Sequence, residues 1–134
     1  MDREELMSFI LDHYESPRNH GIINDPDAFY EGGNPGCGDI VRVYLKIDDN
    51  NLINEIKFDG EGCILSQAGT SIITEAVQGK SVEEVEQMTP EVITDLIGTE
   101  IAMSRPKCTT LGLSTVKFAL KEWNRKKMIN EINS

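Results

Sequence analysis

The sequence predicts an α+β fold in which a small antiparallel sheet of about three strands is covered by helices on one face. Three observations support this prediction. Residues 41–47 alternate apolar and polar side chains, residues 55–59 do the same after a short polar break, and much of the remaining chain carries apolar side chains at helical spacing. The apolar face of such a sheet must be buried against another layer, which the helices supply.

An N-terminal helix is predicted first. Its apolar positions recur at helical spacing, and Asp2 and Glu5 are placed as a capping pair. The helix should end before Pro17, because the residue before a proline disfavours helical geometry. The positions that define the stripe are Leu6, Phe9, Ile10 and His13. The stripe places His13 on the buried face, so we interpret it as a core histidine rather than a ligand.

A β-hairpin follows, preceded by a weaker strand near residues 29–31. Apolar side chains of the two hairpin strands must share one face, because a slip of one residue would turn every side chain over. Pairing Val43 with Phe58 and Leu45 with Ile56 satisfies this condition. The turn then falls at residues 50–51, where two asparagines tolerate positive φ angles.

The rest of the chain reads as helix. An apolar stripe over residues 65–76 ends at Gly79, Ser81 with Glu84 predicts a capping box, and residues 89–90 predict a cap followed by proline at the first helical position. A long C-terminal helix has the apolar stripe Leu113, Val116, Leu120 and Trp123. Residues 1–134 are interpreted as a single domain.

Composition narrows the classes of function. The chain has 134 residues, 39% of them hydrophobic and 27% charged, with a formal net charge of −10. Such a charge argues against binding to nucleic acid or to an anionic membrane surface. The acidic N-terminus lacks a signal-peptide pattern, and no apolar run approaches the ~18 residues of a membrane span. We therefore expect a cytoplasmic protein.

The charge is unevenly distributed. Acidic residues gather between positions 75 and 100, whereas the C-terminal helix carries Lys117, Lys121, Arg125, Lys126 and Lys127. The simpler interpretation is a solvated helix face. The alternative is a docking surface for an acidic protein partner.

Three cysteines lie in segments rich in glycine, proline and charge. Cys37 lies in residues 32–39 (GGNPGCGD), Cys63 follows residues 59–62 (DGEG), and Cys108 follows residues 104–107 (SRPK). Cysteines kept for packing usually lie in apolar runs, and an odd number does not form a closed disulfide framework. These contexts indicate thiols that a metal or a reaction partner reaches, although buried inert cysteines remain the alternative.

The hairpin register brings the first two thiols together. Extended by a few residues, it places Cys37 opposite a neighbour of Cys63, with Asp39 close by. Cys63 and Cys108 each precede a predicted helix, and helix N-termini stabilise thiolates. We predict the ligand set Cys37, Asp39, Cys63 and Cys108, which suits tetrahedral zinc or an iron–sulfur cluster.

Four segments then resemble a known family, the iron–sulfur cluster assembly scaffolds of the NifU/IscU/SufU type. They are residues 12–19 (DHYESPRN), 33–39 (GNPGCGD), 60–66 (GEGCILS) and 107–108 (KC) before a helix. The resemblance implies a scaffold rather than a true enzyme, which accepts sulfur from a cysteine desulfurase, binds iron, builds a transient 2Fe–2S cluster and transfers it to apo-proteins.

The resemblance also implies site roles. Cys37, Cys63 and Cys108 match the family's ligands, and Asp39 matches the aspartate that modulates cluster lability. A hard carboxylate is the natural ligand to exchange when the cluster leaves. Whether one chain holds the cluster or a homodimer bridges it stays open. Cys108 is our candidate for the persulfide acceptor, because Lys107 would favour its thiolate.

Departures from the IscU pattern leave a second function open. Lys107 stands where IscU-type members usually have histidine, residues 101–105 replace the proline-rich chaperone motif, and Leu6 aligns with their N-terminal tyrosine. Residues 105–111 look closer to SufU-type proteins, which bind zinc through three cysteines and this aspartate and relay persulfide as sulfurtransferases. The chain lacks the SufU-type insertion before the third cysteine, so it is intermediate between the two. A purely structural zinc site is disfavoured by the glycine-rich setting.

Overall fold

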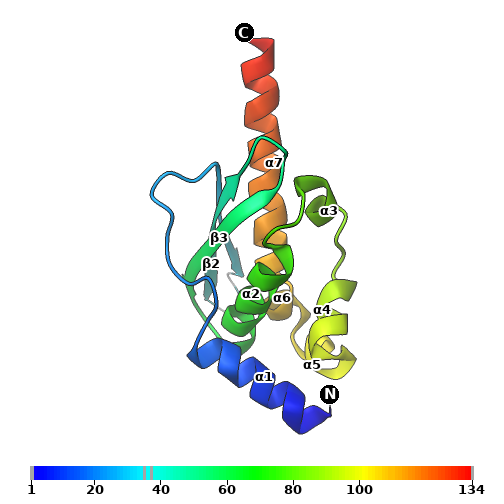
Figure 1. The fold of residues 1–134 in the computed structure, drawn as a ribbon. Coiled ribbons are helices and arrows are strands. Elements are labelled where there is room, and N and C mark those ends of the chain that lie inside the picture. Colours follow the sequence, from blue (N-terminus) through cyan, green and yellow to red (C-terminus); the bar gives the residue numbers. More distant parts are fainter. Residues whose placement is uncertain (1, 35, 37, 134) are drawn as a thin grey trace.

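The predicted α+β class is confirmed in the computed structural model, which describes residues 2–34, 36 and 38–133. One antiparallel sheet has the strand order β1 (Ala28–Asn34), β2 (Asp39–Ile47), β3 (Ile53–Glu61). The helices are α1 (Arg3–Glu15), α2 (Ile64–Val77), α3 (Val82–Glu86), α4 (Glu91–Ile97), α5 (Thr99–Ser104), α6 (Pro106–Thr109) and α7 (Leu111–Ile132). The C-terminal end of α7 projects beyond the sheet, at the opposite end of the molecule from α1 (Figure 1).

The hairpin register is confirmed over most of its length. Val43 pairs with Phe58 and Leu45 with Ile56, and all four side chains are buried. A register shift after Lys46 pairs Ile47 with Ile53, so the connection spans residues 48–52 and the expected two-residue turn is wrong. The carboxylate of Asp48 organises this longer turn by accepting the N–H groups of Asn50 and Leu52, each at 2.9 Å.

Helices α2 and α7 cover the same face of the sheet, and α1 packs against α2. The two covering helices approach closely at Gly112, where an added Cβ would lie 2.8 Å from the Cα of Thr70. Only glycine fits such a distance between helix backbones. The core therefore lies between the sheet and α2 and α7, and the starts of α2 and α7 meet near the start of β2.

Several local predictions are confirmed and one is not. The third strand near residues 29–31 is β1, and α1 ends at Glu15, before Pro17. Ser81 and Glu84 form the predicted capping box. At α4, however, the N-cap is Pro90 and makes no side-chain cap hydrogen bond, so the cap expected at Thr89 is wrong. Within the described chain, no helix has both the length and the apolar character to cross a bilayer.

His13 is a core residue, as the stripe predicted. Its ring is 1% exposed, and Nδ1 lies 2.7 Å from the hydroxyl of Ser71. The pKa of His13 is lowered from its ordinary value of 6.5, first because burial disfavours the imidazolium and then because Arg18 is cationic; Glu75 and Asp12 act in the opposite direction.

This lowered pKa makes folding pH-dependent. Below pH 6.5 the unfolded chain takes up a proton at His13 more readily than the folded chain, so stability is lost as the pH falls from 6.5 towards the folded pKa. We expect His13→Gln to lose less of its free energy of unfolding than the native protein between about pH 7.5 and about pH 5.5 in urea titrations. His20→Gln, which removes the other imidazole, is the control. Equal losses in native protein and His13→Gln would contradict the prediction.

Candidate metal centre

Asp39 joins the start of β2 to the start of α2. Its side chain is buried, with 1% of the residue exposed, and Oδ1 accepts the backbone N–H of Cys63 at 2.8 Å. Cys63 is the N-cap of α2, so this N–H is one of the groups that a helix leaves without an internal partner. The carboxylate takes the place of a capping side chain, and it is held in one orientation as a result.

Two sulfur atoms lie around the other carboxylate oxygen. Oδ2 of Asp39 is 3.3 Å from Sγ of Cys108 and 4.0 Å from Sγ of Cys63. One ligand atom from each of the three residues lies within 4.8 Å of the others. Donor atoms of a tetrahedral zinc site are roughly 3.3–3.8 Å apart, given metal–ligand bonds of about 2.0–2.3 Å. Small side-chain shifts would therefore let the three atoms share one metal.

The structure thus brings together three of the four predicted ligands. Cys37, the fourth, lies outside the described residues. Cys63 begins α2 as expected. Cys108 lies in the single turn α6 just ahead of α7, as expected, but it is buried, with 2% exposed, where an exposed thiol was expected.

The pKa values of Cys63 and Cys108 shift in opposite directions. Burial raises the pKa of Cys63, but the influence of Ser66 and of the Cys108 thiol outweighs burial, and the net effect lowers its pKa. The pKa of Cys108 is raised to about 12, first by burial and then by contact with the Asp39 carboxylate.

The expected effect of Lys107 is absent from this geometry. Lys107 is exposed, it is not among the groups that shift the pKa of Cys108, and the shift is upward instead of downward. The expectation treated the two residues as neighbours because they are adjacent in sequence. Within α6, burial of the sulfur beside a carboxylate outweighs that proximity.

The family described as NifU-like N terminal domain matches residues 6–130. This chain belongs to that family. The match includes the three ligand residues that the structure brings together, and it also includes Cys37.

Proteins similar to this chain include iron–sulfur cluster assembly scaffolds and a zinc-dependent sulfurtransferase. The iron-sulfur cluster assembly scaffold protein IscU 1 of Archaeoglobus fulgidus is 34% identical over 87% of this chain and 75% of its own length. IscU of Haemophilus influenzae is 34% identical over 87% of this chain and 94% of its own length. The zinc-dependent sulfurtransferase SufU of Bacillus subtilis is 39% identical, over 66% of this chain and 58% of its own length.

Solved structures agree with this assignment. A putative iron-sulfur cluster assembly scaffold for the SUF system from Fervidobacterium islandicum superposes with a TM-score of 0.72 at 28% identity, covering 84% of this chain and 93% of the other. The N-terminal part of a NifU-like protein from Brucella abortus superposes with a TM-score of 0.77 over 93% of this chain and 99% of the other. Its 19% identity makes it evidence for the fold alone.

Two site residues of this NifU-like domain were missed by reasoning from the sequence. Asn34 points its Nδ2 atom at Sγ of Cys108, 3.9 Å away, and Ser66 lies three residues after the N-cap Cys63. Ser66 could have been found, because the third residue after an N-cap supplies the N–H that an N-cap side chain accepts. Asn34 carried no such signal, since its contact spans 74 residues of sequence.

Gly62 makes room for the carboxylate. An added Cβ at this position would lie 2.2 Å from Oδ1 of Asp39 and 2.9 Å from Oγ of Ser66. Its φ of +148° is also a conformation that other residues rarely adopt. The glycine before Cys63 is therefore required by the hydrogen bond between Asp39 and Cys63.

Substitution of Gly62 tests this requirement. Gly62→Ala should displace Asp39 and weaken zinc binding by at least about tenfold, measured by competition with a chromophoric chelator. The control is Gly79→Ala, because Gly79 also has a positive φ (+87°) but an added Cβ would meet no atom within 4 Å. The control should cost about 1–2 kcal/mol of unfolding free energy and leave zinc affinity unchanged. Equal zinc affinities in the two variants would refute the role assigned to Gly62.

Proposed function

We propose that this protein is a scaffold for iron–sulfur cluster assembly. It accepts sulfur from a cysteine desulfurase, binds iron, and builds a 2Fe–2S cluster that it transfers to apo-proteins. The observation that carries the proposal is the mixed donor set of one buried carboxylate and two thiols, Asp39, Cys63 and Cys108, within 4.8 Å. The scaffold names of relatives that cover most of this chain support it.

The four ligands have different tasks in this proposal. Cys37, Cys63 and Cys108 are the soft thiolate ligands, and Asp39 is the hard ligand that exchanges when the cluster leaves. Asp39 suits this task because its Oδ1 stays bonded to the N–H of Cys63 at 2.8 Å, so Oδ2 can release iron while the carboxylate keeps its place. The bond from iron to Oδ2 can therefore break while the hydrogen bond of Oδ1 keeps the Asp39 side chain in position.

Sulfur is proposed to arrive at Cys108. The Cys108 thiol gives its proton to the Asp39 carboxylate, 3.3 Å away, as its sulfur attacks the outer sulfur of the desulfurase cysteine persulfide; a new S–S bond forms at Cys108, and the donor's S–S bond breaks to release the desulfurase cysteine as a thiolate. Cys108 lines a pocket of about 430 Å³ together with Pro106 and Lys107, which offers an approach to this residue. Cys63 is the rival acceptor, since it is only half-buried whereas Cys108 is buried.

Cluster assembly is the first test. Metal-free protein incubated anaerobically with iron, cysteine and a desulfurase should develop visible absorption with equal amounts of iron and acid-labile sulfide. Asp39→Ala and Asp39→Asn should both lose the cluster to an apo-acceptor more slowly, because the exchangeable hard ligand is gone. Asp39→Asn is the sharper variant, since an amide oxygen can still accept the N–H of Cys63. Absence of a cluster, or faster loss from both variants, would contradict the scaffold role.

The acceptor thiol is tested by sulfur labelling. Cys108→Ser should abolish transfer of radioactive sulfur from the desulfurase, while Cys63→Ser should keep it. Far-UV circular dichroism of both variants checks that the fold persists. Persistent labelling of Cys108→Ser, with loss in Cys63→Ser, would move the acceptor role to Cys63.

A second function is favoured by one comparison. The SufU relative is named a zinc-dependent sulfurtransferase, and the same donor set suits tetrahedral zinc. In that case zinc would hold the thiolates, persulfide would form on a released sulfur, and no cluster would be built. Stimulation of desulfurase turnover that depends on zinc, without cluster formation, would identify this enzyme-like relay.

A cluster-bridged homodimer, a single domain over residues 1–134 and a cytoplasmic location stay predictions.

A further inference from the structure

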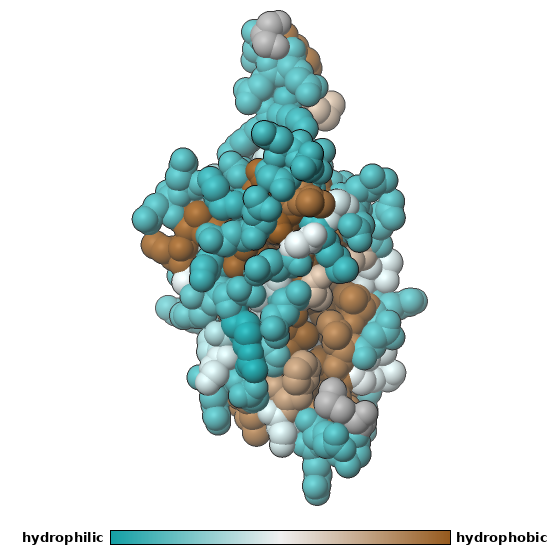
Figure 2. Space-filling view, viewed as in Figure 1, coloured by the Kyte–Doolittle hydropathy of each residue, from teal (hydrophilic) through white to brown (hydrophobic). Residues whose placement is uncertain are grey.

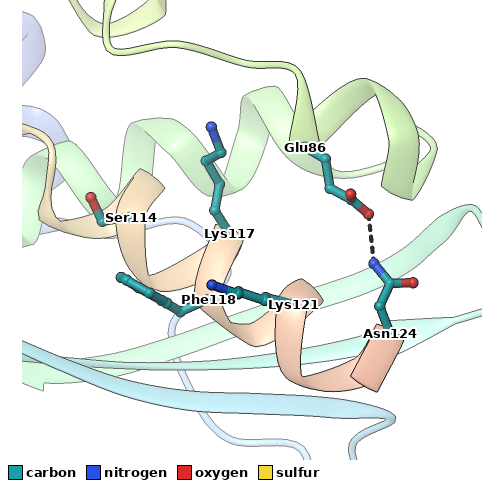
Figure 3. A pocket seen from close by; sticks show the side chains of 6 residues that line it. All are labelled: Glu86, Ser114, Lys117, Phe118, Lys121 and Asn124. Atoms are coloured by element: carbon teal, nitrogen blue, oxygen red, sulfur yellow. Dashed lines mark hydrogen bonds between the residues drawn. The ribbon is translucent and has the colours of Figure 1, made fainter. Parts of the chain in front are cut away.

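A groove runs along one side of α7 and ends at Cys108. Three hollows of about 460, 450 and 430 Å³ follow one another along it. The first two share Ser114 and Phe118 in their linings, and the last two share Asn34 and Lys107. Figure 3 shows the side chains of α7 that line the hollow farthest from Cys108, with Glu86 hydrogen bonded to Asn124 at its edge.

The groove belongs to a basic part of a strongly acidic protein. Residues 105–134 carry seven basic and two acidic side chains, whereas residues 1–104 carry six basic and 21 acidic ones. The space-filling view shows the projecting end of α7 as mainly hydrophilic (Figure 2). The molecule therefore presents opposite charge on two parts of its surface, and the groove follows the positive part.

The cations in the groove are available for a partner. Arg105, Lys107 and Lys121 are exposed and form no salt bridge with any residue that the structure describes, although the chain holds an excess of carboxylates. The carboxylates in the groove are already engaged, because Glu31 pairs with Arg42 at 2.9 Å and Glu86 accepts from Asn124 at 2.8 Å.

An aromatic surface lies between the cations. Tyr30 of β1 and Phe118 of α7 stack with ring centroids 5.2 Å apart, and Phe118 is 47% exposed. Lys107 lies on one side of this pair along the groove and Lys121 on the other, one in each adjoining hollow. A ligand that matches the groove thus needs negative charges separated by an apolar or aromatic group.

We propose that this groove binds an extended acidic segment of a partner protein, with an aromatic or apolar side chain of that segment seated on Phe118. Carboxylates of the segment would pair with Lys121 at one end and with Lys107 and Arg105 at the other. Because the groove ends at Cys108, the bound partner would be held beside the thiol and carboxylate site. That last consequence rests on the proposed function, whereas the binding itself does not.

A partner protein is favoured over a second copy of this chain. The dense acidic stretch of this chain, residues 75–100, lies largely in helices α2 to α5 and is not an extended segment. Its Glu86 already contacts α7 of the same molecule through Asn124. Nucleic acid is disfavoured because the acidic body would repel its phosphates.

The proposal is tested with a synthetic probe. A fluorescein-labelled peptide of about eight residues, with glutamates flanking a central phenylalanine, should bind the metal-free protein in fluorescence anisotropy and bind less tightly as salt is added. Lys121→Glu should weaken binding at least about fivefold. The matched control is Lys126→Glu, which makes the same charge change on α7 at an exposed position that does not line the hollows. It should bind the peptide nearly as well as the native protein.

Each other outcome overturns the proposal. No binding, equal losses in Lys121→Glu and Lys126→Glu, or equal binding of a peptide with glutamine in place of glutamate would show that no specific groove for acidic segments exists. A dimer in sedimentation velocity that Lys121→Glu dissociates would assign the groove to a second copy. Chemical reconstitution of the cluster on Lys121→Glu with iron and sulfide, in the absence of a desulfurase or any other partner protein, should match the native protein, so failure of the groove and failure of the scaffold role are distinguishable.

Discussion

The hydrogen bond from the backbone N–H of Cys63 to the Asp39 carboxylate is the contact on which the candidate site depends. It joins the start of β2 to the start of α2 and leaves one carboxylate oxygen facing the sulfur of Cys108 at 3.3 Å. Burying a carboxylate costs free energy unless donors or a cation stabilise it. A helix N-terminus supplies part of that stabilisation, and a metal ion held by the same carboxylate and thiolates would supply the rest.

The local backbone makes this contact attainable. Gly62 lets the carboxylate approach, since any side chain there would collide with Asp39. Ser66 in the first turn of α2 lies beside Cys63, donates its hydroxyl to the carbonyl oxygen of Cys63 at 3.1 Å, and helps to lower the pKa of that thiol. Cys108 is differently placed, because burial beside the same carboxylate raises its pKa to about 12. The two cysteines beside this carboxylate therefore have thiols of different acidity. Ligands that differ in this way suit a site that must release a bound cluster.

Charge divides the surface in a way that fits an exchange protein. From its charge we expect the acidic body to disfavour contact with nucleic acids and anionic membranes, while the basic groove along α7 leads towards Cys108. Stacking of Tyr30 on Phe118 connects β1 to α7 in the middle of that groove. The same packing that covers the sheet therefore also shapes the surface beside the metal site.

The sequence by itself determined the α+β class, the hairpin pairing of Val43 with Phe58, the buried role of His13 and the closeness of Asp39 to Cys63. These features follow from side-chain period and short-range backbone rules, which are local. Only the tertiary structure decided the five-residue turn, the raised pKa of Cys108 and the contact of Asn34 with its sulfur. Burial and long-range contact set those properties, and neither can be read from neighbours in the sequence.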